Sequence, residues 1–101
     1  MEQLAEIERG IVRGIVDRAL VKGWRVSVWD DYTDEGERVV TRSDNRLVIF
    51  AAMGTTGGDT LRFYDRSGRN LGAVVFVWGN GLDALHDHTD NANMRAIVGW
   101  L

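Results

Sequence analysis

The chain has 101 residues, the length of one ordinary domain with a single hydrophobic core. Hydrophobic residues make up 45% and charged residues 27%, close to the globular average, which excludes a disordered or fibrous chain. The absence of cysteine excludes disulfides, cysteine-ligated metals and thiol catalysis. No apolar run is long enough to span a membrane and the acidic start is unlike a signal peptide, so we expect a cytoplasmic protein.

Fifteen acidic side chains outnumber twelve basic ones, which gives a net charge of −3. Proteins that bind nucleic acid usually present a basic surface that displaces counterions from phosphates, and no such run is visible here. We therefore expect no nucleic-acid partner. Acidic side chains are instead concentrated in one eight-residue stretch, at Asp30, Asp31, Asp34, Glu35 and Glu37.

An amphipathic helix is predicted over residues 2–22. Apolar side chains recur at spacings of three and four from Leu4 to Ala19, and Gly23 provides a stop. Two glycines interrupt this helix, Gly10 and Gly14, and they lie on one face. Small residues on one face predict the close approach of another backbone; the alternative is that both glycines are defects that a well-packed helix tolerates.

Alternating or continuous apolar residues predict four strands, at residues 25–29, 37–42, 60–65 and 71–78. The acidic stretch 30–37 and the Gly-containing segment 65–70 are predicted to be turns between them. The last ten residues carry a further apolar pattern that predicts a short C-terminal helix.

An internal repeat is predicted because the chain aligns with itself, without gaps, at an offset of 35 residues. Val26–Asp30 then lies on Leu61–Asp65, and the apolar pattern continues to about residues 53 and 88. The single domain 1–101 would contain two ββα units, 25–53 and 60–88. The predicted fold class is α+β, with an N-terminal helix and one four-stranded antiparallel sheet that has helices on one face. The alternative makes 46–53 a strand and gives a five-stranded antiparallel meander flanked by helices.

Both histidines of the chain lie in one polar segment, residues 86–91. Imidazole and carboxylate groups together can bind zinc or iron, whereas the same residue types are also typical of a helix stop followed by a turn. We interpret the segment first as a cap and turn, with no cofactor. The alternative is a metal-binding regulator or a metal-dependent hydrolase with the ligands His86, Asp87, His88 and Asp90.

Gly79-Asn80-Gly81 follows an apolar strand, as phosphate-binding turns do, but the fuller glycine-rich fingerprints are absent. No serine lies in a nucleophile-elbow pattern. The sequence therefore predicts a protein without catalytic residues, that is, not an enzyme.

Aromatic residues beside the acidic stretch predict a protein-binding surface. The repeat aligns Trp29 with Tyr64, which suggests one exposed sheet face, and exposed aromatic residues often anchor interfaces. The alternative is that they pack under a helix or a partner subunit. A dense acidic loop can dock on an arginine-rich surface or imitate DNA phosphates. The predicted contact residues are Trp29, Asp30, Asp31, Asp34, Glu35, Glu37 and Tyr64. A homodimer is a further expectation.

Three segments in the C-terminal half carry a resemblance: Asp59–Arg62, Gly79–Asp83 and His88–Asn91. This half looks like a group of small uncharacterised bacteriophage and prophage proteins. The resemblance implies a phage origin, and many small acidic phage proteins act by binding and blocking host machinery. We therefore expect a small acidic binding protein that engages a host protein complex, with an anti-defence inhibitor as one form. A structural phage component is the remaining alternative.

Overall fold

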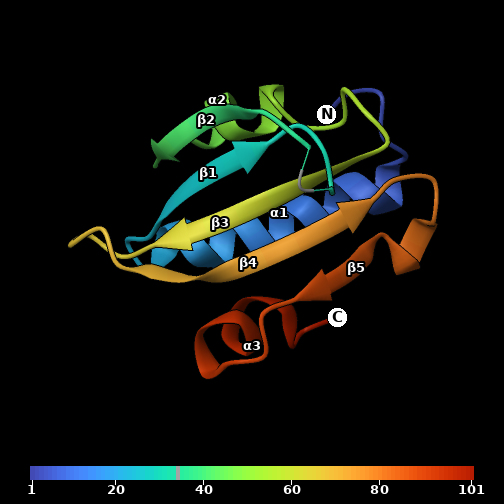
Figure 1. The fold of residues 1–101 in the computed structure, drawn as a ribbon. Helices are drawn as coiled ribbons and strands as arrows, with labels where there is room; N and C mark the ends of the chain where they lie inside the picture. Colours follow the sequence, from blue (N-terminus) through green and yellow to red (C-terminus); the bar gives the residue numbers. More distant parts are fainter. Residues whose placement is uncertain (34) are drawn as a thin grey trace.

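The computed structural model describes residues 1–33 and 35–101, so the predicted contact residue Asp34 lies outside the described residues. Helices and strands follow one another along the chain as shown in Figure 1. In order they are α1 (Glu6–Val21), β1 (Arg25–Trp29), β2 (Arg38–Ser43), α2 (Arg46–Ala51), β3 (Gly58–Tyr64), β4 (Asn70–Val77), the 3-10 turn η1 (Gly81–Asp83), β5 (Leu85–His88) and α3 (Ala92–Val98).

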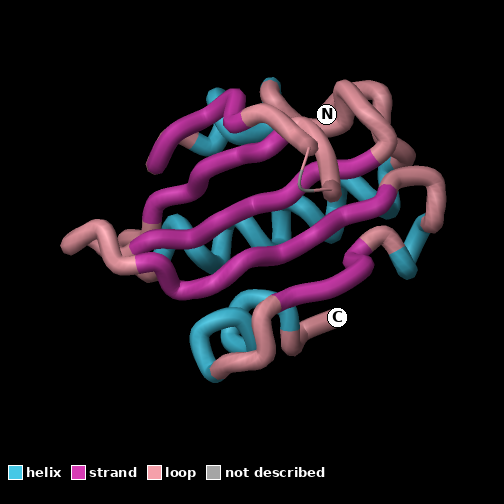
Figure 2. Tube along the Cα trace, viewed as in Figure 1, coloured by secondary structure: helices cyan, strands magenta, loops and turns pink. Residues whose placement is uncertain are grey.

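The strands form one antiparallel sheet in the order β2-β1-β3-β4-β5 (Figure 2). The helices α1, α2 and α3 pack on one face of this sheet and contact its strands. Figure 1 looks onto the opposite face, in front of which no described helix lies. We call this the open face. The predicted α+β class, with helices on one face of an antiparallel sheet, is confirmed, and the sheet has the five strands of the alternative.

The fifth strand does not come from residues 46–53, where the alternative placed it. That segment is helical because the side chain of Asn45 accepts hydrogen bonds from the backbone N–H groups of Leu47 and Val48, which caps α2. Residues 85–88 supply the strand instead, so the helix predicted for the end of the second ββα unit is wrong. The backbone of β4 needs a hydrogen-bonding partner along its outer edge, and β5 provides it.

The hydrophobic core lies between the sheet and the three helices. α1 contributes the buried stripe that its spacing predicted, although Ile7 in its first turn is 55% exposed. Phe63 and Phe76, on the two adjacent strands β3 and β4, are the largest fully buried side chains. Among the described residues, no helix is both long enough and apolar enough to cross a membrane.

The pairing of β1 with β3 has a regular register over five residue pairs. Its central pair is Ser27 with Arg62, the two positions that the 35-residue offset aligns. Side chains alternate between the two faces along each strand, and directly paired residues share a face. Val26 and Val28 therefore point into the core together with Phe63 and Leu61, whereas Trp29 and Tyr64 lie on the open face near its two ends.

The two helical glycines have different surroundings, although they lie one turn apart. A Cβ atom at Gly14 would sit 2.2 Å from Cζ2 of Trp100, whereas a Cβ atom at Gly10 would meet nothing within 4 Å. The Trp100 ring fills the space over Gly14, and the guanidinium carbon of Arg18 lies 4.5 Å from the centroid of this ring. The indole N–H of Trp100 donates to the carbonyl of Ile97. The close contact at Gly14 is therefore made by the side chain of Trp100 and not, as the sequence predicted, by another backbone.

This difference makes a matched pair of substitutions informative. Gly10→Ala is expected to stabilise the protein by about 1 kcal/mol, because alanine is the better helix former and the space is open. Gly14→Ala makes the same chemical change but displaces the Trp100 ring, so its gain in helix propensity is offset by lost contacts. Thermal unfolding of both variants checks this. An equal rise in Tm for the two would contradict the placement of Trp100.

Candidate functional site

Trp29 lies between two arginines on the open face. The guanidinium of Arg62, on β3, lies 4.7 Å from the Trp29 ring centroid, and that of Arg38, on β2, lies 5.9 Å from it. Both distances are within the range of cation–π attraction. Neither arginine forms an ion pair with another described residue. The partly buried indole is thus held in place, while two guanidinium groups remain available to an anionic partner.

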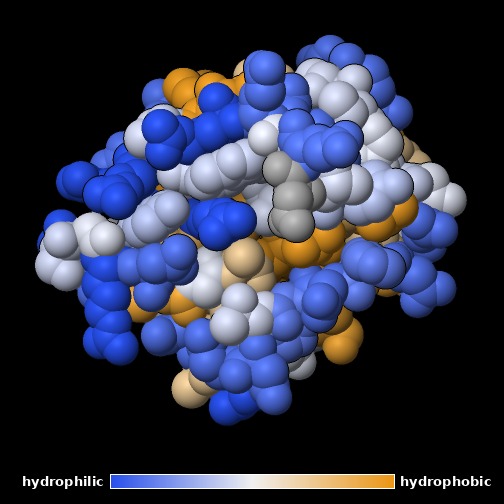
Figure 3. Space-filling view, viewed as in Figure 1, coloured by the Kyte–Doolittle hydropathy of each residue, from blue (hydrophilic) through white to orange (hydrophobic). Residues whose placement is uncertain are grey.

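A hollow of about 220 Å³ opens beside this stack. Trp29 and Tyr32 contribute its aromatic lining, and Arg62 is its basic residue; the remaining lining is Thr33, Thr60, Ala73 and Val75. Tyr32 lies close over the backbone of Gly58, and Thr60 donates to the carbonyl of Asp31, so the loop after β1 is fixed against β3. Figure 3 shows this face, with a hydrophobic strip along β4 bordered by hydrophilic side chains over β2.

Tyr64 lies on the same face but is not accessible as an interface anchor. It is 9% exposed, and the guanidinium of Arg42 covers its ring at 4.5 Å. This end of the face therefore presents two exposed arginines to solvent, Arg42 and Arg25. Arg25 is the residue paired with Tyr64 in the sheet. The aromatic contact predicted at Tyr64 is replaced by basic side chains.

The predicted acidic contact residues divide into two groups. The carboxylate of Asp30 accepts from the N–H of Glu37 at 2.9 Å, and that of Asp31 accepts from the N–H of Thr33 at 3.2 Å. These two side chains hold the loop in its shape, as acidic residues commonly do in turns. Glu35 and Glu37 are exposed and form no ion pair with another described residue. Among the described acidic residues of this loop, these two remain free for a partner.

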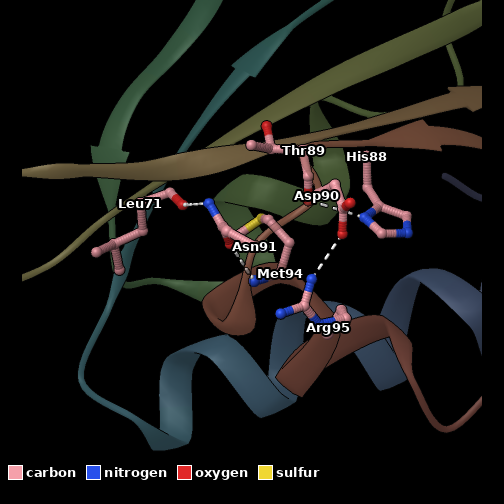
Figure 4. Close-up of polar contacts among 7 residues, drawn as sticks. All are labelled: Leu71, His88, Thr89, Asp90, Asn91, Met94 and Arg95. Atoms are coloured by element: carbon pink, nitrogen blue, oxygen red, sulfur yellow. Dashed lines mark hydrogen bonds and ion pairs between the residues drawn. The ribbon is translucent and has the colours of Figure 1, made fainter.

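The polar segment 86–91 is a strand end, a turn and a helix cap, as Figure 4 shows. Asn91 accepts from the N–H of Met94 and so caps α3, while its amide group donates to the carbonyl of Leu71. Asp90 pairs with Arg95 at 2.6 Å, and a ring nitrogen of His88 lies 2.9 Å from the carbonyl of Thr89.

These contacts contradict the alternative metal site. His86, Asp87, His88 and Asp90 do not converge, and no group of three or more potential ligands in the described part of the chain could hold a metal ion. Two local features keep these side chains apart. The pairing of β4 with β5 has a register shift beside His86, and the carboxylate of Asp87 accepts a hydrogen bond from the backbone N–H of His88. The predicted helix stop is also wrong, because residues 86–88 lie in β5, and the cap in this segment is that of Asn91 at the start of α3.

The glycine turn after β4 is already occupied by a carboxylate of the chain. Glu8, on α1, is 2% exposed, and its carboxylate accepts from the backbone N–H groups of Gly79 and Asn80. The closest of these contacts is 2.9 Å. Since these N–H groups are the ones that would cradle a phosphate, the turn is not a phosphate site. It ties the start of α1 to the end of the sheet.

Asp59 is a buried acid that the sequence analysis missed. Its Oδ2 atom accepts from the N–H of Gly54 at 2.8 Å and from the indole of Trp78 at 2.9 Å, while its Oδ1 atom is buried without a partner among the described residues. Burial raises the pKa of Asp59 to about 6, and the two hydrogen bonds offset only part of this effect. The predicted strand began at residue 60, whereas β3 begins at Gly58, so Asp59 was placed outside the strand and its core-facing position could not be recognised.

Comparison with known proteins adds no family to this picture: no family model matches the chain, and neither a curated protein nor a solved structure matches it.

Proposed function

We propose that this chain is a small binding protein whose open sheet face holds an acidic segment of another protein. The observation that carries the proposal is the stack of Arg38, Trp29 and Arg62 beside the hollow, on a face that no described helix covers. Tryptophan and arginine are the residues most enriched where binding energy is concentrated. A guanidinium can bind a carboxylate through two parallel hydrogen bonds, which suits an acidic peptide.

Charge distinguishes a protein segment from a nucleic acid as the occupant. Arg25, Arg38, Arg42 and Arg62 favour an anion, but Glu35 and Glu37 lie in the loop that borders the Trp29 hollow. A continuous polyanion would be repelled there, and the net charge of −3 opposes it further. A short acidic segment with neutral or basic flanks satisfies both ends of the face.

The resemblance to phage proteins supports a bacterial host protein as the partner. Binding to a host protein complex, as an anti-defence inhibitor would do, is the form of the proposal that we favour. The partner's acidic segment is expected to insert one side chain into the hollow and place its carboxylates on the two arginines.

A pair of charge-reversed proteins tests the proposal. Arg38→Glu with Arg62→Glu removes the basic groups around Trp29, whereas Arg66→Glu with Arg69→Glu makes the same change of net charge in the β3–β4 turn. Each protein is used to capture partners from a nuclease-treated bacterial lysate, and the captured proteins are identified by mass spectrometry.

We expect one host protein at near-equal stoichiometry with the wild type and with the turn variant, and its loss with the open-face variant. Circular dichroism and thermal unfolding confirm that both variants fold. Equal capture by the two variants would show that the open face is not the contact surface.

A further inference from the structure

A second hollow, of about 490 Å³, lies between α1 and α2 on the helical side of the molecule. Two arginines of α1, Arg9 and Arg13, line it on one side, and Leu47, Phe50 and Ala51 from α2 line it on the other. The remaining lining comes from residues 1–3. It is separate from the open face, because the helices lie behind the sheet in Figure 1.

The two arginines lie one helical turn apart, and neither forms an ion pair with a described residue. Like charges at this spacing repel each other on a helix. Asp17, the residue one turn beyond Arg13, is held by Arg46 through two hydrogen bonds of 3.0 and 2.9 Å. Glu2, the carboxylate of the lining, forms no ion pair with any described residue.

Arg9 shows the clearest sign of a missing partner. Its Nε atom is buried and has no acceptor among the described residues. A buried donor without an acceptor is costly, and such groups are rare in folded proteins. An anion in the hollow would supply the acceptor and reduce the repulsion between Arg9 and Arg13.

We infer that this hollow binds a small organic anion that carries a short apolar group. The anionic end, a phosphate monoester or a carboxylate, lies on the Arg9 and Arg13 guanidinium groups, which suit planar recognition of such oxygens. The apolar part lies against Leu47 and Phe50. The volume of the hollow lies within the range of small-molecule pockets.

Titration of the intact chain with hexyl phosphate, inorganic phosphate and hexanol tests the inference. The N–H signals of the arginine side chains are followed by NMR, and affinities are measured by calorimetry. We expect hexyl phosphate to bind and to shift the Arg9 Nε–H signal. Inorganic phosphate is expected to bind more weakly and hexanol not to bind measurably, because each lacks one of the two contacts.

Three variants make the outcome decisive. Arg13→Gln, at an exposed position, should weaken the affinity for hexyl phosphate by about tenfold, since it removes a charge-assisted hydrogen bond. Leu47→Ser should weaken the affinity for hexyl phosphate but not that for inorganic phosphate. Arg69→Gln, far along the chain in the β3–β4 turn, should change neither affinity. Equal binding of hexanol and hexyl phosphate, no shift of the Arg9 signal, or unchanged affinity in Arg13→Gln would overturn the inference. Hexyl phosphate should bind in solution without any lipid present, and binding to anionic phospholipid vesicles alone would overturn the inference in favour of a membrane surface.

Discussion

Asp59→Asn is expected to stabilise the protein by roughly 3 kcal/mol above pH 7 and to leave its stability near pH 4 almost unchanged. Burial raises the pKa of Asp59 from 3.8 to about 6 in the folded state. Each pKa unit corresponds to about 1.4 kcal/mol, so the ionised folded form carries a cost of roughly this size. Asparagine keeps an acceptor for Gly54 and Trp78 but cannot ionise.

The direction of the pH dependence follows from proton binding. Between pH 4 and pH 6 the folded state holds a proton on Asp59 that the unfolded state has already released, so the free energy of unfolding falls as the pH rises. Below pH 4 both states are protonated, and above pH 6 to 7 both are ionised, so the contribution of Asp59 is constant.

Urea unfolding of the wild type and Asp59→Asn from pH 4 to pH 8 measures the difference. Asp83→Asn, at an exposed carboxylate, controls for the change in net charge. The difference in the free energy of unfolding between the wild type and Asp59→Asn should grow from pH 4 to pH 6. The corresponding difference for Asp83→Asn should stay small. A variant that is less stable than the wild type at pH 8 would show that the ionised carboxylate is favourable where it lies.

Gly58→Ala is expected to destabilise the protein by about 3 kcal/mol. A Cβ atom at this position would lie 2.3 Å from the carbonyl oxygen of Phe76 and 2.5 Å from Cδ1 of Tyr32. The carbonyl belongs to the adjacent strand β4 and cannot move without breaking the sheet, so the clash is not relieved by a side-chain rotation. The same change should displace Tyr32 from the wall of the Trp29 hollow.

The adjacent glycine provides the control. Gly57→Ala makes the same chemical change one residue away, where Tyr32, at 3.9 Å, is the one described residue that the new Cβ atom would meet. Its effect on the free energy of unfolding should stay within about 0.5 kcal/mol, as is usual for exposed positions. Denaturant unfolding of the two variants gives the comparison. Similar losses in both would mean that β3 and β4 are not as closely paired at Gly58 as the structure shows.

Local patterns allowed much of the fold to be predicted from the sequence. Strand β1 has the bounds that alternation predicted, and the offset of 35 residues aligns Ser27 with Arg62, which are paired at the centre of the sheet. The offset also aligns Asp30 with Asp65, and each carboxylate accepts a backbone N–H across its own turn. The bounds of β1 and the two turn contacts depend on residues close together in the chain, which a sequence displays directly.

The features that could not be predicted depend on contacts between distant segments. Nothing within residues 82–88 shows that β4 has an edge to fill, so the strand β5 could not be distinguished from a helix. The polar segment at His86 and His88 has the composition of a metal site, and its register in the sheet decides against one. Likewise, the arginines around Trp29 come from two other strands, so no run of basic residues in the sequence predicted a basic surface on the open face.

The central claim is that the open face around Trp29 binds acidic protein segments, and NMR titration with a decapeptide that carries two adjacent glutamates between neutral residues tests it most directly. The account predicts that the Nε–H signals of Arg38 and Arg62 and the indole N–H signal of Trp29 shift together and saturate, while those of Arg66 and Arg69 stay in place. Added salt should weaken the effect, because the contact is between charges. Absence of these shifts, or larger shifts with a thymidine decanucleotide than with the peptide, would contradict the account.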